Sequence, residues 1–159
     1  MIASKAFYQV TKDLKDHLLQ NDVTNTVTYG DLSEVDLNKQ TIFPLSHINV
    51  ESVSLNGNYM TFSITVLNMD IVHDRIEAPE TSTDDNRFNG TDNEMDVLNT
   101  QLWVSGNLTK HMERGDIRDE GYELASQPTC EPFSDRFANR LAGWAMSFDL
   151  NVTNDLSSC

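Results

Sequence analysis

The sequence predicts an α+β fold: an antiparallel-dominated sheet with a long β-hairpin and two amphipathic helices packed on one face. Two segments, at 4–20 and 94–114, repeat apolar residues at helical spacing, and two others alternate apolar with polar residues as half-buried strands do. An Asn56-Gly57 pair between alternating segments adds the hairpin. Because 159 residues suit one domain, we expect a single α+β domain over residues 1–159.

The chain opens with the predicted helix over residues 4–20. Its apolar stripe consists of Phe7, Val10, Leu14 and Leu18. Ser4 can cap the first turn, because a serine hydroxyl accepts a hydrogen bond from a backbone N–H that the helix leaves unpaired. A strand over 23–29 follows and stops at Gly30. After a polar loop, Pro44 is expected at a strand entrance or edge, because proline donates no backbone hydrogen bond.

The hairpin, over residues 47–72, is the most strongly patterned part of the chain. In its second arm Met60, Phe62, Ile64 and Val66 share one face, and Thr61, Ser63 and Thr65 share the other. Asn56-Gly57 favours a type I′ turn, in which both central residues adopt positive φ. The apolar positions change face between Val50 and Val53 and again between Val66 and Leu67, which predicts bulges or a passage between two environments.

An acidic loop is expected at about 73–93. Between Asp70 and Asp96 the chain has nine acidic and two basic residues, and few of the residues there are apolar. Such a composition leaves little to bury, so we expect this loop to be flexible.

The second helix, over 94–114, has a predicted apolar stripe of Met95, Leu98, Leu102, Ser105, Leu108 and Met112. Gly106 predicts close packing of this helix on the sheet, since glycine costs about 1 kcal/mol relative to alanine in a helix. A short strand at 122–124 comes next.

The end of the chain is predicted to close the sheet. Two prolines, Pro128 and Pro132, punctuate the segment after the short strand. A closing strand at 144–152 alternates five apolar residues with polar or small ones. Gly143, just ahead of it, predicts a bend or a bulge.

Composition excludes several classes of function. Formal charge is −14, from 11 basic and 25 acidic residues, so the surface should repel nucleic acid. No run approaches the ~20 apolar residues of a membrane span, and the first residues do not form a secretion signal. Cys130 and Cys159 are therefore not expected to form a structural disulfide.

The best candidates for a metal or acid–base site are His47, Asp70, His73 and His111. Asp70 and His73 lie at a strand end and converge only where the strand has ended, whereas His111 also suits the last turn of a helix electrostatically. No catalytic, zinc or phosphate-binding motif is present, and the spacing after Asp84 fails the calcium-loop pattern. We expect no catalytic residue, no metal and no cofactor.

Other features indicate contacts with partners. Arg136 and Arg140 suit either a subunit contact or an ordinary surface pair. The small, hydroxyl-bearing face of the hairpin suits close approach by another sheet, another subunit or a lining. A two-stranded ribbon this long is marginal alone, so its tip is expected to rest on a neighbour. The predicted assembly interface therefore comprises Asn56, Gly57, Arg136 and Arg140.

The order of these elements resembles that of the tail-terminator, or tail-completion, proteins of tailed bacteriophages. Three stretches also resemble small proteins of phage structural-gene clusters: Thr41–Leu45, Val66–Val72 and phrases between Glu131 and Asp149. The resemblance covers nearly the whole chain. In that family a ring of subunits caps the tail tube and joins it to the head connector, and no catalytic residues exist to carry over.

The resemblance implies a structural virion protein that forms a homohexameric ring at the tail or neck and is assembled in the host cytoplasm. Its partners would be itself, the tail tube and the head connector, with DNA passing through the channel without sequence-specific contact and no membrane involved. Another tail or baseplate ring protein is one alternative. An alternative of a different class is a small intracellular metal- or ligand-binding domain, or an enzyme, using His47, Asp70, His73 and His111.

Overall fold

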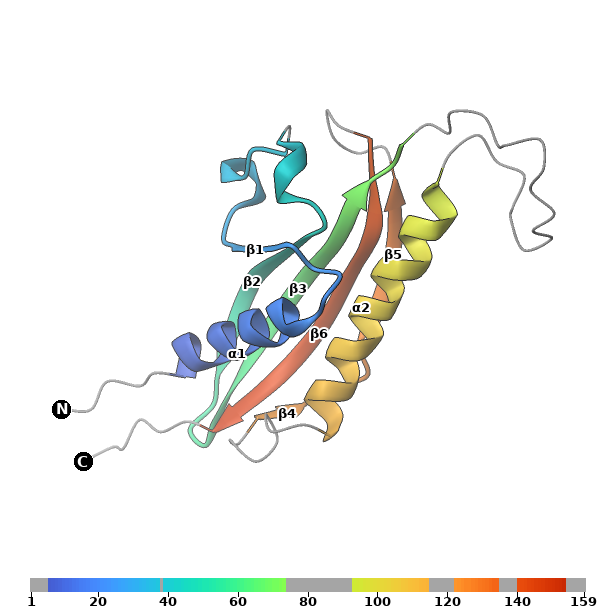
Figure 1. The fold of residues 1–159 in the computed structure, drawn as a ribbon. Coiled ribbons are helices and arrows are strands. Elements are labelled where there is room, and N and C mark those ends of the chain that lie inside the picture. Colours follow the sequence, from blue (N-terminus) through green and yellow to red (C-terminus); the bar gives the residue numbers. More distant parts are fainter. Residues whose placement is uncertain (1–5, 38, 74–92, 115–121, 135–139, 154–159) are drawn as a thin grey trace, which may run out of the picture.

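The computed structural model describes residues 6–37, 39–73, 93–114, 122–134 and 140–153, and it has the predicted α+β fold (Figure 1). Both helices lie across one face of a six-stranded, mostly antiparallel sheet. The elements in chain order are α1 (Ala6–Gln20), β1 (Thr26–Tyr29), η1 (Leu32–Glu34), η2 (Gln40–Ile42), β2 (Leu45–Leu55), β3 (Tyr59–Ile71), α2 (Glu94–Arg114), β4 (Tyr122–Leu124), β5 (Thr129–Ser134) and β6 (Leu141–Thr153). The predicted cap Ser4 and nearly all of the predicted acidic loop fall outside the described residues.

The strand order is β1-β2-β3-β6-β4, and β5 pairs with β6 as well. β1 runs parallel to β2, and the other described pairs are antiparallel. A parallel pair needs a crossover connection, which the segment with η1 and η2 provides. β1 is shorter than predicted because a turn comes first, in which the Thr24 N–H donates to Asn21 O. The two edges of the sheet are therefore β1 on one side and β4 with β5 on the other.

Apolar side chains cover both faces of the sheet, but over different lengths. The main core lies between the sheet and the two helices and includes Leu14, Phe62, Leu108 and Phe148. A smaller cluster lies on the opposite face, where residues around η1 and η2 pack against Leu45, Met69 and Leu141. The rest of that opposite face carries the hydroxyl-bearing residues of β3.

The hairpin confirms one predicted bulge and explains the other phase change. The β2–β3 register shifts between Val50 and Ser52, as the first arm predicted. β3, in contrast, keeps an unbroken register with β6 across Val66 and Leu67. Leu67 faces the smaller cluster instead, so the second phase change is a passage between two apolar environments.

The turn at the end of the hairpin differs from the prediction. β2 ends at Leu55 and β3 begins at Tyr59, and the Asn56 N–H donates to Tyr59 O at 3.0 Å, so the two-residue turn is centred on residues 57–58 rather than on Asn56-Gly57. Among the described glycines the positive φ belongs to Gly30, at 103°, and not to Gly57. A type I′ turn needs positive φ at both central residues, so the turn over residues 57–58 is not of that type.

The helices bury partly different residues from those predicted. α1 buries Val10, Leu14 and Leu18 as expected. α2 has the predicted bounds, but its buried residues are Val97, Gln101, Val104, Ser105, Leu108 and Met112. Met95 and Leu102 are 53% and 42% exposed, so the predicted stripe is rotated about the helix axis. Gly106 is exposed with open space around it, and the predicted close packing on the sheet is wrong.

The C-terminal region contains a strand that was not predicted because of its prolines. It also contains a glycine that is not the predicted bend or bulge. β5 includes Pro132, which an edge strand tolerates because its N–H side need not pair. Gly143 lies within one continuous β6, so the predicted bend or bulge is wrong. A Cβ at Gly143 would lie 2.0 Å from Asn68 O, and the residue is glycine because the β3 backbone approaches so closely.

Candidate functional site

Of the residues predicted to carry chemistry, His47 is a buried structural side chain. It lies on β2 beside β1, with Nδ1 2.7 Å from Thr28 Oγ1 and Nε2 2.8 Å from Gly30 O. Because a carbonyl only accepts, Nε2 donates to Gly30 O and Nδ1 accepts from the Thr28 hydroxyl. Burial lowers the pKa of His47, against the opposing effect of the bond to Gly30. Both ring nitrogens are engaged inside the fold.

Asp70 and His73 lie together near the end of β3. Asp70 Oδ1 accepts from the Ile71 N–H at 2.8 Å, and burial raises the pKa of Asp70 while the nearby His73 opposes that rise. The backbone N–H of His73 donates to Asn93 Oδ1 at 2.7 Å, which fixes the approach to α2. The contacts of Asp70 and His73 therefore fix the chain at the end of β3 and at the start of α2.

His111 lies elsewhere, stacked on His17 of α1. The two ring centroids are 3.9 Å apart with 10° between the ring planes. Burial lowers the pKa of His17, and the charge of His111 lowers it further. The four candidates thus do not converge, and the described ranges hold no group of three or more His, Cys, Asp or Glu that could bind a metal ion.

A buried polar relay that the sequence analysis missed joins α2 to the sheet. The Ser46 hydroxyl donates to Asn68 Oδ1 at 2.7 Å, Asn68 Nδ2 donates to Ser105 Oγ at 2.8 Å, and the Ser105 hydroxyl donates to Gln101 O at 3.1 Å. The signal was Asn68 itself, a polar residue within an apolar strand. Burial also raises the pKa of the neighbouring Cys130 thiol, so that thiol is not activated as a nucleophile.

The hydroxyl-bearing residues of β3 alternate with those of the main core and form a cross-strand ladder on the opposite face of the sheet. Its rungs are Thr61 to Asn151 at 2.7 Å, Ser63 to Asp149 at 2.7 Å and Thr65 to Glu51 at 2.6 Å. Each of the three hydroxyls therefore has its donor paired within the sheet.

The residues predicted to form an assembly interface lie in different parts of the protein. Asn56 and Gly57 are exposed in the hairpin tip, which we define as residues 53–59. That tip also exposes Leu55 at 77% and Tyr59 at 42%. Arg140 Nη2 lies 3.9 Å from Glu94 Oε2 at the start of α2, so it makes a contact within the chain. Arg136 lies outside the described residues.

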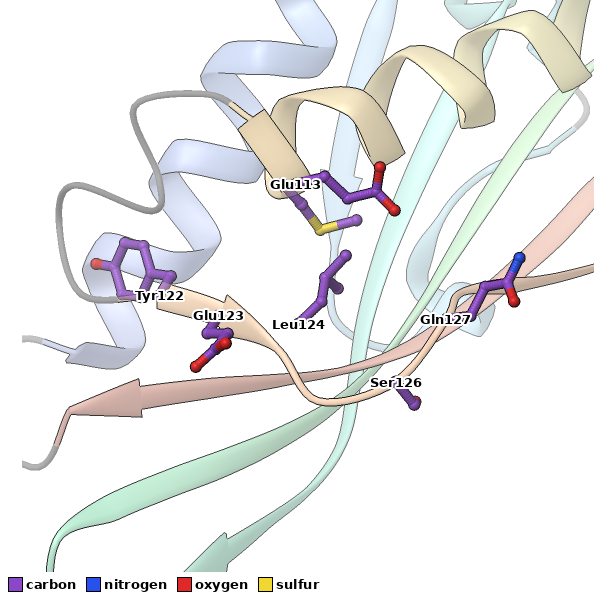
Figure 2. A pocket seen from close by; sticks show the side chains of 7 residues that line it. Glu113, Tyr122, Glu123, Leu124, Ser126 and Gln127 are labelled. Atoms are coloured by element: carbon purple, nitrogen blue, oxygen red, sulfur yellow. The ribbon is translucent and has the colours of Figure 1, made fainter.

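Two hollows lie beside opposite edges of the sheet. One, of about 630 Å³, separates α1 from β1 and is lined by Tyr8, Thr11, Lys12, Lys15, Asp16, Val27, Thr28, Tyr29 and Ile48. The other, of about 450 Å³, lies between the end of α2 and β4, and Glu113 and Glu123 are among its lining residues (Figure 2). These hollows and the hairpin tip are surface features of the described residues to which a partner could bind.

These features make the chain an α+β domain whose candidate functional residues lie at sheet edges and a hairpin tip. Comparison of the sequence with protein-family models and with curated proteins finds no match. No helix in the described part of the chain is both long enough and apolar enough to cross a membrane.

Proposed function

We propose that this chain is a structural ring subunit of the tail or neck of a tailed bacteriophage, which ends the tail tube and joins it to the head connector. The observation that carries the proposal is the hairpin tip. Leu55 is 77% exposed there although the same strand buries Leu45 and Ile48 completely or nearly so. A long hairpin that ends in exposed apolar side chains suits burial against a neighbouring subunit or the tail tube.

The ladder on the open sheet face also supports an assembly role. Its three hydroxyls donate across strands to Asn151, Asp149 and Glu51. A neighbouring subunit that packs on this face would meet hydroxyl donors that are already paired. The candidate residues for metal or acid–base chemistry, by comparison, make structural contacts in separate places.

Solution mass and electron microscopy test the proposal directly. The purified chain should form a closed ring, expected to be hexameric, in light scattering and in negatively stained images. An antibody raised against the chain should label tailed particles from the source at the head-proximal end of the tail. A chain that stays monomeric at its highest soluble concentration, or that is missing from the particles, would overturn the proposal.

A further inference from the structure

The hollow beside β1, at one edge of the sheet, is lined by more basic than acidic side chains. The hollow between α1 and β1 is lined by Lys12 and Lys15, both exposed, against one acidic lining residue, Asp16. Beside them Tyr29 is 52% exposed. Among the described strands β1 pairs only with β2, so its outer side is open. We call this surface the basic edge.

The opposite edge carries acidic side chains around the second hollow. Glu113 from the last turn of α2 and Glu123 from β4 are exposed and line it, and Figure 2 shows these two side chains with Leu124 and Gln127 around the pocket. Among the described strands β4 pairs only with β6, so this edge is open too. Arg114 follows Glu113 but is not one of the lining residues. We call this surface the acidic edge.

Open strand edges with opposite charges on the two sides of one sheet suit head-to-tail association. In a chain of net charge −14, most surfaces repel a second copy, and the basic edge is a place where an acidic surface is attracted. A head-to-tail contact uses two different surfaces of the same subunit, and repetition of that contact closes into a ring when the rotation permits.

We infer that the basic edge of one copy docks on the acidic edge of the next copy, with Lys12 and Lys15 facing Glu113 and Glu123. This inference rests on the proposed ring function and names the surfaces that would build the ring. Open strand edges normally need protection against pairing, and a neighbouring copy provides it here at both edges.

Charge reversal of each edge tests the inference. Lys12→Glu with Lys15→Glu should prevent assembly, because two acidic edges then meet, and Glu113→Lys with Glu123→Lys should prevent it, because two basic edges meet. Each variant should raise the dissociation constant at least about tenfold, since like charges oppose association. A mixture of the two variants should assemble again, and so should the chain with all four reversals. Lys39→Glu with Lys110→Glu, at two exposed positions that line neither hollow, makes the same change in net charge as the reversal of Lys12 and Lys15 and is the matched control for that variant.

Light scattering and native mass spectrometry provide the readouts, and circular dichroism verifies that each variant is folded. Assembly should also weaken as salt rises, because exposed charges are screened. A wild-type oligomer that neither double reversal disturbs would overturn the edge contact and leave the ring function standing. A wild-type chain that stays monomeric would overturn both. Edge-dependent oligomers that are missing from tailed particles would overturn the ring function alone.

Discussion

At Gly143 the backbone of β3 leaves no room for any side chain. A Cβ there would lie 2.0 Å from Asn68 O and 2.8 Å from the Met69 Cα, and both are backbone atoms within a paired strand. Gly143→Ala should therefore lower the free energy of unfolding by at least about 2 kcal/mol, because strand pairing has to shift. Urea unfolding measures the change.

Two other glycines are matched controls for that substitution. A Cβ at Gly57 or Gly106 meets nothing within 4 Å. Gly106→Ala should raise the free energy of unfolding by about 1 kcal/mol, because alanine is the better helix former at an exposed position. Equal effects of alanine at positions 106 and 143 would show that the close approach of β3 does not explain Gly143.

The buried His47 and the half-buried His17 make stability depend on pH. Burial lowers the pKa values of His17 and His47 from 6.5, so the unfolded chain takes up protons that the folded chain resists. Their contribution to stability is present above pH 6.5 and is lost as pH falls through the lowered pKa values.

The substitution His17→Phe separates the effect of protonation on stability from the effect of ring stacking. Phenylalanine keeps an aromatic ring against His111 but cannot be protonated. The free energy of unfolding should then fall less steeply between about pH 7 and pH 5, while the remaining slope comes in part from His47. Urea unfolding across that range gives both slopes, and identical slopes would contradict a role for His17.

Between elements, the Ser46–Asn68–Ser105 relay fixes α2 on the sheet. Leucine matches asparagine in branching and in the number of side-chain heavy atoms, but Asn68→Leu leaves the buried Ser46 hydroxyl without its acceptor, so it should cost about 2–3 kcal/mol. The triple variant Ser46→Ala, Asn68→Leu, Ser105→Ala should recover part of that loss, because the polar groups are removed together. Unfolding in urea compares the two, and a triple variant less stable than the single one would contradict this account.

The same relay explains which features of α2 the apolar periodicity predicted correctly and which it did not. The pattern predicted the bounds of α2 and the alternating face of β3, because apolar spacing follows local geometry. It placed Met95 and Leu102 inside, because polar Gln101 did not count as a core residue. Gln101 lies inside because the hydrogen bond from Asn68 to Ser105 fixes α2 over the sheet, and that bond joins residues 37 positions apart.

At the scale of the whole molecule, contacts between residues far apart in the sequence determine the features that the sequence pattern did not predict. The fold class follows from patterns, and the hairpin follows from two alternating arms around a turn. The pairing of β1 with β2 in parallel and the stack of His17 on His111 have no local signal. The four candidates for chemistry were grouped by residue type alone, and the fold gives them separate structural partners. The two charged edges appear only once the strand order is known.

Assembly through the hairpin tip is tested at Leu55 and Tyr59. Their exposed apolar side chains flank residues 56–58, and the free chain gains little from them. Leu55→Ser with Tyr59→Ser should leave the unfolding transition of the monomer within about 0.5 kcal/mol, as exposed substitutions usually do. The same pair should reduce ring formation, because the apolar area that a neighbour would bury is removed.

The matched control for the tip is Met95→Ser with Trp103→Ser. These residues are 53% and 57% exposed on the outer side of α2, so the control removes exposed apolar surface away from the hairpin. Asn56→Ala with Gly57→Ala is a second comparison, since Gly57 has no positive φ and its alanine would meet open space in the monomer. That pair should keep the hairpin paired, so any loss of assembly would come from contacts of the tip itself. If the Leu55 and Tyr59 variant assembles as well as the α2 control, the tip is not buried in the ring, and the charged edges would have to hold the subunits together without it.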